Sequence, residues 1–434
     1  MLQLAAATVI SMQGAGIRDQ NRIDVAQTAP SSSVDYGGPI LERPTLTGDW
    51  GGMRNELSSH GLDLHVDLTQ FYQGVTRGGL EGGLESGGKL DYWLNLDGQK
   101  AGLWTGFAVT THAETRYGND TNANDGLFTF SNFNMAFPKA GEDVTAVTSF
   151  KLTQTVSDEF SLIAGKINSL DDFTLNFTGR NGLDRFMNSA ATANIISART
   201  VPYSTYGAGF VLTSAKEQSL MFLVRDPDNH SASSDLDQLF ANGALFTGVA
   251  RLPVAPMGLP GNQVFGVNWS TRDYTSVDPA SSFDVPGQGL VAGTESGSWA
   301  LWYNCDQYLW VSDTDDDRGW GVFGMSGISD GNPNPVRWNA TLGIGVNGLF
   351  AARRHDTLGA AYFHVGLSSD FKSLLAQPTA PPGLEQRDEQ GVELFYNAEL
   401  TPWCHLSSDL QFVQPSTKDL NNTVVFGMRL KFDF

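Results

Sequence analysis

From Gly61 onward, apolar and polar residues alternate at every second position through most of the chain. The alternation is clear in 62–69 (LDLHVDLT), 107–116 (FAVTTHAETR) and 424–434 (VVFGMRLKFDF). Successive side chains of a β-strand point to opposite faces of the sheet, so each of these segments has one apolar and one polar face. The periodicity predicts an all-β chain of antiparallel strands. It does not separate a soluble sheet from a membrane barrel, because soluble antiparallel sheets show it too.

The number of strands and the lengths of their connections favour a membrane barrel. Long connections, such as 118–144 and 169–202, alternate with short ones, such as 157–159, 215–217 and 401–402. Outer-membrane barrels have an even number of strands, long outer loops and tight periplasmic turns. We therefore expect a 16-stranded antiparallel transmembrane β-barrel with a short N-terminal helix and an inward-folded long loop. Its predicted strands are 61–77, 89–97, 103–117, 145–156, 160–168, 203–214, 218–225, 242–254, 262–274, 298–311, 319–328, 338–349, 356–368, 390–400, 403–414 and 422–434.

Composition and charge exclude other classes of protein. Charged residues make up 17% of the 434-residue chain, below the roughly 25% of an average soluble domain. The most apolar stretch, 241–260, is broken by one arginine and two prolines, so a helical membrane span is not expected. The net charge, 27 − 47 = −20, argues against nucleic acid as a partner.

Three regions follow from the pattern. Residues 1–45 are interpreted as a signal-like or flexible N-terminal lead, 46–60 as a periplasmic segment with a short helix, and 61–434 as the barrel. The first ten residues, MLQLAAATVI, resemble the apolar part of a signal peptide but lack the basic residues that precede one. Cys305 and Cys404 lie five predicted strands apart, so no disulfide is expected.

Tryptophans mark the two edges of the predicted barrel. Four lie beside short turns, where barrels carry a periplasmic aromatic girdle, and two lie at the long-loop ends of their strands. They are Trp104, Trp310, Trp320 and Trp403, and then Trp299 and Trp338. The chain ends in Phe434 on the apolar face, as in the C-terminal strand that outer-membrane assembly machinery recognises. We expect a protein integral to the bacterial outer membrane, in contact with its lipid and lipopolysaccharide.

Six short motifs between residues 46 and 434 are similar to sequence blocks of one known family. They are 46–54 (LTGDWGGMR), 299–303 (WALWY), 306–310 (DQYLW), 329–335 (SDGNPNP), 395–403 (FYNAELTPW) and 409–415 (DLQFVQP). In this order they resemble the OprB-type carbohydrate-selective porins. The resemblance implies a 16-stranded barrel through which monosaccharides and related small polar solutes diffuse. It also implies either a monomer or a homotrimer.

Charged residues of one loop and of the inward wall are candidates for lining the passage. A porin narrows where a long loop folds inward, and the charges there set its size and charge preference. The loop 169–202, after the fifth strand, is the candidate by position. Guanidinium and carboxylate groups together can hydrogen-bond sugar hydroxyls, although some of these side chains will instead tie the loop to the wall. The candidates are Asp171, Asp172, Arg180, Arg185 and Arg199 from the loop, near Asp184, and Arg77, His112, Glu114, Arg116 and Lys151, whose strand parity points inward.

No catalytic site, metal site or cofactor is expected. His112 and Glu114 share a face, as an acid–base pair would, but no serine motif or histidine pair accompanies them. The acidic run 313–317 (DTDDD) lacks the glycine and the closing glutamate of a calcium loop. We expect a passive porin for small carbohydrates. The alternatives are a general or anion-preferring porin on the same scaffold, a barrel hydrolase and a soluble carbohydrate-binding β protein.

Overall fold

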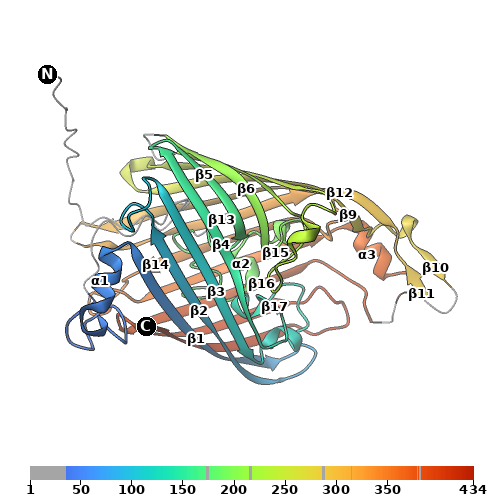
Figure 1. Ribbon diagram of the computed structural model, residues 1–434. Coiled ribbons are helices and arrows are strands. Elements are labelled where there is room, and N and C mark those ends of the chain that lie inside the picture. The colour runs from blue at the N-terminus through green and yellow to red at the C-terminus, as the bar shows by residue number, and fades with distance from the viewer. Residues whose placement is uncertain are drawn as a thin grey trace.

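The computed structural model describes residues 36–172, 175–214, 218–285, 289–313, 315–378, 380 and 383–434. Sixteen of its strands form one closed antiparallel barrel in which β1 pairs with β18 (Figure 1). The strands are β1 (Leu62–Arg77), β2 (Gly83–Asp97), β3 (Phe107–Gly118), β4 (Val144–Ser157), β5 (Phe160–Asn168), β6 (Ser204–Thr213), β7 (Ser219–Arg225), β8 (Leu245–Val254), β9 (Gly261–Thr275), β12 (Thr294–Ser312), β13 (Asp315–Ser329), β14 (Val336–Asn347), β15 (Thr357–Leu367), β16 (Glu389–Thr401), β17 (Cys404–Gln414) and β18 (Thr423–Asp433). The predicted 16-stranded barrel is confirmed.

Short elements at the two ends of the barrel complete the fold. The predicted N-terminal helix is α1 (Met53–Ser59), which lies beside β1 at the short-turn end (Figure 1). At the long-loop end lie α3 (Ser369–Leu375) and a hairpin of β10 (Phe283–Val285) and β11 (Gly289–Val291), which the alternation did not predict. None of the described helices is long and apolar enough to cross a membrane. Most of the predicted N-terminal lead, and part of the acidic run 313–317, lie outside the described residues.

The barrel is apolar outside and polar inside, the reverse of a soluble protein. On β18, Phe426 and Met428 are exposed on the outer face, while Arg429 and Lys431 are buried on the inner face. A transmembrane barrel alternates in this way because its outer face meets lipid and its inner face meets water or polar side chains. Trp104 and Trp310 are exposed near short turns, as the predicted girdle requires. The cysteines, on β12 and β17, are free as expected.

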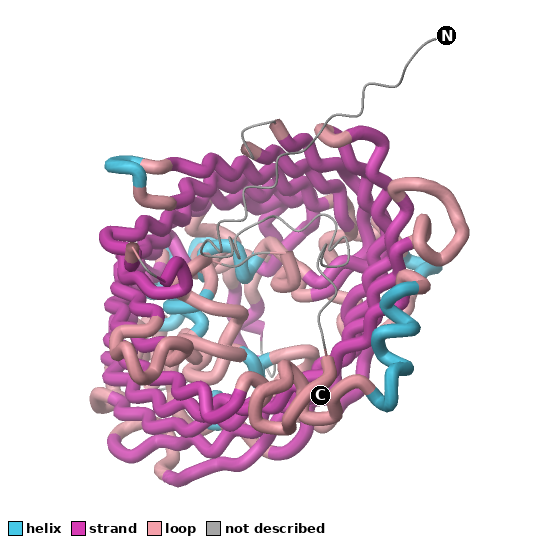
Figure 2. The backbone as a smooth tube through the Cα atoms, turned by 90° about the vertical axis from the view of Figure 1, so that its left-hand side faces the viewer, coloured by secondary structure: helices cyan, strands magenta, loops and turns pink. Residues whose placement is uncertain are grey.

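Two long loops, 119–143 and 169–203, fold into the lumen. Viewed along the barrel, loops and short helices lie inside the ring of strands (Figure 2). They carry α2 (Ser189–Thr192) and the 3₁₀ turns η2 (Thr121–Ala123), η3 (Asn134–Ala136) and η4 (Ile195–Arg199). Three further 3₁₀ turns, η5 (Leu236–Gln238), η6 (Pro256–Gly258) and η7 (Pro279–Ser281), lie in other connections. Of these two loops, only the second was predicted from the sequence to fold inward.

Glycines on the inner wall leave room for the apolar side chains of the second inward loop. Gly321 and Gly345 face each other on β13 and β14, and a Cβ on either would lie within 2.8 Å of the Phe177 ring. A Cβ on Gly327 would lie 2.6 Å from Ile196. Phe177 and Ile196 are fully buried against these bare stretches of backbone. Close backbone approach of this kind is one use of glycine within a strand.

Candidate functional site

Buried acidic side chains of β16 hold both inward loops to the wall. Glu393 accepts hydrogen bonds from the backbone N–H groups of Met187 and Asn188, the second at 3.2 Å. Glu389 accepts from the N–H groups of Phe128 at 2.7 Å and Thr129 at 2.8 Å. Both glutamates are fully buried. Each carboxyl group accepts two successive backbone N–H groups of one inward loop, so β16 fixes the height of both loops in the lumen.

The two loops are also bonded to each other. The N–H of Phe133 donates to the carbonyl oxygen of Met187 at 2.8 Å, and the N–H of Ser189 donates to that of Phe130 at 2.9 Å. On β18, Arg429 donates to the carbonyl oxygens of Gly182 and Arg185, at 2.6 and 3.1 Å. The loops therefore form one connected partition across part of the lumen.

A large cavity, with an empty volume of about 2390 Å³, lies between this partition and the wall from β5 to β14. Four phenylalanines of the first loop line it, together with several asparagines and one wall tryptophan. They are Phe128, Phe130, Phe133, Phe137, Asn168, Asn181, Asn194, Asn229, Asn268, Asn304, Asn334 and Trp302. Its guanidinium groups come from Arg199, Arg225, Arg251 and Arg272. It thus combines rings with hydrogen-bonding groups.

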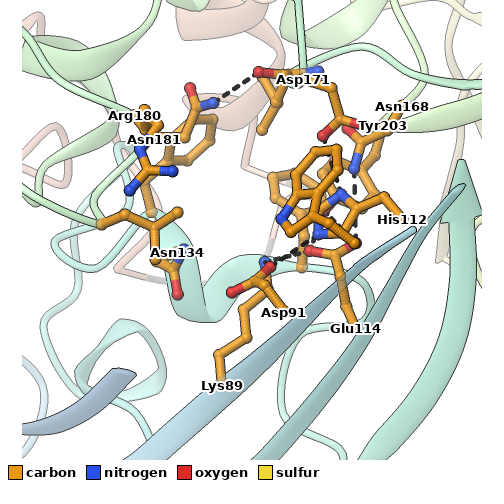
Figure 3. Close-up of a pocket in the computed structure, with 15 residues that line it drawn as sticks. Lys89, Asp91, His112, Glu114, Asn134, Asn168, Asp171, Arg180, Asn181 and Tyr203 are labelled. Carbon is orange, nitrogen blue, oxygen red and sulfur yellow. Dashed lines mark hydrogen bonds and ion pairs between the residues drawn. The ribbon is translucent and has the colours of Figure 1, made fainter. Parts of the chain in front are cut away.

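A smaller cavity, of about 510 Å³, lies between the loops and the wall strands β2 and β3 (Figure 3). His112 bonds Asp91 through Nε2 at 2.9 Å and Asp171 through Nδ1 at 3.0 Å. Its ring stacks on Trp93, with ring centroids 3.7 Å apart. Asp171 begins the second inward loop, so this network attaches the loop to β2 and β3.

A second network of polar contacts in the smaller cavity surrounds Glu114. Glu114 forms an ion pair with Lys89 and accepts a hydrogen bond from the hydroxyl group of Tyr203 at 2.7 Å. Burial, together with the neighbouring charge of Glu114, holds the pKa of Tyr203 well above its usual range, so this hydroxyl remains a donor. Burial also raises the pKa of Asp171, although the imidazole of His112 opposes that shift.

The two cavities adjoin at the aromatic residues of the loops. Six lining residues are common to both, namely Phe133, Phe137, Asn168, Leu170, Asn181 and Tyr203. The rings of Phe137 and Tyr203 stack at 4.2 Å with an interplanar angle of 8°. The junction therefore has a rigid aromatic side and an amide side.

The structure brings most of the predicted site residues to these cavities. His112, Glu114, Asp171 and Arg180 line the smaller one, and Asp172 and Arg199 line the larger one. Lys151 is outside both linings and forms an ion pair with Asp172 at 2.5 Å. Arg180 forms an ion pair with Asp184 at 3.3 Å. Burial alone would raise the pKa of Asp184, but Arg180 lowers it to about 2.

Two predicted arginines of the loops and the adjoining wall lie outside both cavity linings. Arg116 is fully buried and donates to the carbonyl oxygens of Met135 and Glu142, so it ties the first inward loop to β3. Arg185 is buried within the second loop, where burial lowers its pKa.

The predicted inward orientation of Arg77 is wrong. Val75 pairs with Val425, but the register of β1 against β18 then shifts, so that Arg77 pairs with Val424. An unbroken register would instead pair Arg77 with Thr423, which is buried on the inner face. The extra residue of a β-bulge reverses the side-chain alternation beyond it. Arg77 is accordingly exposed, opposite a residue of the outer face.

Among the described residues, two groups of side chains have a geometry that could hold a metal ion, but each has a lysine beside it. They are Asp91 with His112 and Glu114, and His65 with Asp67 and Asp433. Lys89 lies 3.7 Å from Asp91, and Lys431 lies 2.9 Å from Asp67. The ammonium groups already supply the positive charge that these carboxylates need, so neither group is a favourable cation site.

Neither the inward path of the loop 119–143 nor the cavity-lining arginines Arg225, Arg251 and Arg272 were predicted from the sequence. Four phenylalanines between residues 128 and 137, in an otherwise polar connection, were an available signal for an ordered loop. The inward parity of Arg251 on β8 was another, since it is shared with the buried residues Leu245, Thr247 and Val249.

Comparisons with known proteins agree with this architecture. The family described as carbohydrate-selective porin, OprB family, matches residues 81–434. The putative porin QuiX of Acinetobacter baylyi is 23% identical, over 91% of this chain and 94% of its own length. A high-pH structure of Pseudomonas putida OprB superposes with a TM-score of 0.78 at 20% identity, covering 92% of this chain and all of that one. A low-pH structure of the same protein gives a TM-score of 0.55 at 17% identity, covering 91% of this chain and 99% of that one.

The family match covers most of the chain, and the likeness in fold extends over the whole barrel. The chain therefore belongs to the OprB family of carbohydrate-selective porins, which are passive channels integral to the outer membrane and not enzymes.

Proposed function

We propose that small carbohydrates diffuse through this barrel by way of the two adjoining cavities. A solute would enter the large cavity from the long-loop end, pass the aromatic junction and leave through the smaller cavity. The constriction would lie where Phe133, Phe137 and Tyr203 oppose Asn181, since these residues line both cavities. Of the predicted residues, the solute would contact His112, Glu114, Asp171, Asp172, Arg180 and Arg199, and Lys151 would hold Asp172 through an ion pair.

The observation that carries this proposal is the two-sided junction. A pyranose ring has an apolar C–H face and a rim of hydroxyl groups. The stacked rings of Phe137 and Tyr203 offer a flat apolar surface, and the amide of Asn181 lies in the same lining. Pockets that orient small polar ligands combine apolar walls with a few placed polar groups. A general porin does not need such a surface.

Liposome swelling tests the carbohydrate preference directly. We expect glucose to enter faster than a short polyethylene glycol of equal size. Phe137→Ala should reduce this advantage severalfold, because an aromatic contact contributes about 0.5–1.5 kcal/mol. Phe150→Ala, on the lipid-facing side of β4, is the matched control. If sugars enter no faster than their size predicts, the protein is a general diffusion porin instead.

A further inference from the structure

The guanidinium groups of the large cavity come from neighbouring elements of one wall. Arg225 ends β7, Arg251 lies on β8 and Arg272 lies on β9, three consecutive strands of the barrel. Arg199, at the end of η4, lies in the same lining. Among the described residues that line this cavity, Asp172 is the only one with a carboxylate.

Two carboxylates near this wall are already paired with cationic side chains. Asp172 is bound to Lys151 at 2.5 Å, and Asp228 is bound to Arg272 at 2.8 Å. Arg199 is exposed to the lumen, its guanidinium lies 5.7 Å from the ring centre of Tyr274, and no described carboxylate forms an ion pair with it.

Arg225 is the most informative member of the wall because it is only 3% exposed. Its guanidinium donates to two hydroxyl oxygens, that of Ser169 at 2.6 Å and that of Thr247 at 2.7 Å, and its Nε is buried without a hydrogen-bond partner. No described carboxylate lies within ion-pair distance of it. Burying a charge without an opposite charge is unfavourable. An anion passing through the channel would be stabilised here, because it supplies the negative charge that the buried guanidinium group of Arg225 lacks.

The arginines of β7, β8 and β9 give this part of the wall a positive charge, although the net charge of the whole chain is −20. An arginine excess in the lumen of an acidic protein is therefore a local feature. Charges along a narrow, low-dielectric channel concentrate solutes of the opposite sign. The phenylalanines of the first inward loop, Phe128, Phe130, Phe133 and Phe137, line the same cavity. The solute that fits both surfaces is a small ring with hydroxyl groups and one carboxylate.

We propose that this channel prefers carboxylated sugars and related cyclic polyhydroxy acids to neutral sugars. The preference rests on the proposed function, since it names the substrate class of the same passage. Arg199 and Arg225 would attract and guide the carboxylate, while the aromatic side of the cavity would receive the ring.

Block of potassium chloride current in planar bilayers tests the preference. Glucuronate and glucose have similar size and differ by one carboxylate. We expect glucuronate to block at a concentration about tenfold lower than glucose, as one charge-assisted contact would give. In a gradient of potassium glucuronate, the zero-current potential should show that glucuronate is at least as permeant as potassium.

Substitutions in the wall locate the effect. Arg199→Gln together with Arg225→Gln should bring the block by glucuronate to within about twofold of the block by glucose. The matched control removes two lysines of the exposed loops, Lys139→Gln with Lys418→Gln, which lie outside both cavity linings and pair with exposed glutamates. The exposed Arg199→Gln alone should lower the preference about threefold, which keeps the test usable if the buried Arg225 proves necessary for folding.

The outcomes separate this inference from the proposed function. Equal block by glucose and glucuronate would overturn the preference and leave the sugar channel intact. An equal loss of preference in the lysine control would also overturn it, because the effect would then come from the charge of the outer loops. If neither sugar blocks, and glucose enters liposomes no faster than a polyethylene glycol of its size, the proposed function itself fails.

Discussion

Replacing Glu393 by alanine tests how firmly the inward loops are held to the wall. In the structure this buried carboxylate accepts the backbone N–H groups of Met187 and Asn188. A buried N–H left unpaired costs about 1–3 kcal/mol, and two such groups donate to Glu393. Water in the lumen would satisfy part of that loss. We therefore expect Glu393→Ala to weaken the attachment by about 2–4 kcal/mol.

This weakening changes the channel more than it changes the barrel. At about 1.4 kcal/mol per tenfold change, the population with the segment around Met187 released rises by roughly 30- to 700-fold. Arg429 still holds the carbonyl oxygen of Gly182, and the strand ladder is untouched. The expected result is a higher mean single-channel conductance and a noisier open current in planar bilayers.

Glu399→Ala is the matched control, because Glu399 lies on the same strand near the short-turn end. It forms no hydrogen bond with any described residue of either inward loop. Resistance of the folded barrel to detergent, compared with and without heating, checks that both variants are folded. If the conductance and noise of folded Glu393→Ala match those of the control, the carboxylate does not hold the loop and the reasoning is refuted.

Particular contacts elsewhere in the molecule give three further predictions. Arg77→Gln should leave sugar passage unchanged in liposome swelling, since the bulge turns this side chain outward; a slower rate would show that it reaches the lumen. Burial raises the pKa of Asp125 from 3.8 to about 7, so its stabilisation of the first inward loop is complete below about pH 4 and is lost as the pH rises through 7. Hydrogen exchange of that loop should therefore quicken over this range, and Asp125→Asn should remove the dependence. Gly345→Ala places a Cβ 2.4 Å from Phe177 and should lower the melting temperature, whereas Gly82→Ala, with its nearest atom at 3.8 Å, should not.

Much of the barrel could be predicted from the chain because its determinants are local. Alternation in segments such as 62–69 is set by which side chains meet lipid, and the lengths of the connections identify the two ends. Strand number and ends were therefore accessible without any structure, and so was the inward parity of His112 and Glu114. The alternation predicted the wrong orientation for Arg77, because the single extra residue of the bulge in β1 cannot be recognised from the order of polar and apolar residues.

The path of the loops was decided by contacts distant in the sequence. The hydrogen bonds that the N–H groups of Phe128 and Thr129 donate to Glu389 join residues about 260 positions apart. The space for Phe177 exists only because Gly321 and Gly345 meet on adjacent strands. The sequence by itself determined that the chain closes into a barrel with a polar lumen, since that follows from a repeated local pattern. Only the tertiary structure decided which rings and guanidinium groups line the same cavity, because that depends on how far two loops fold inward and on which wall residues receive them.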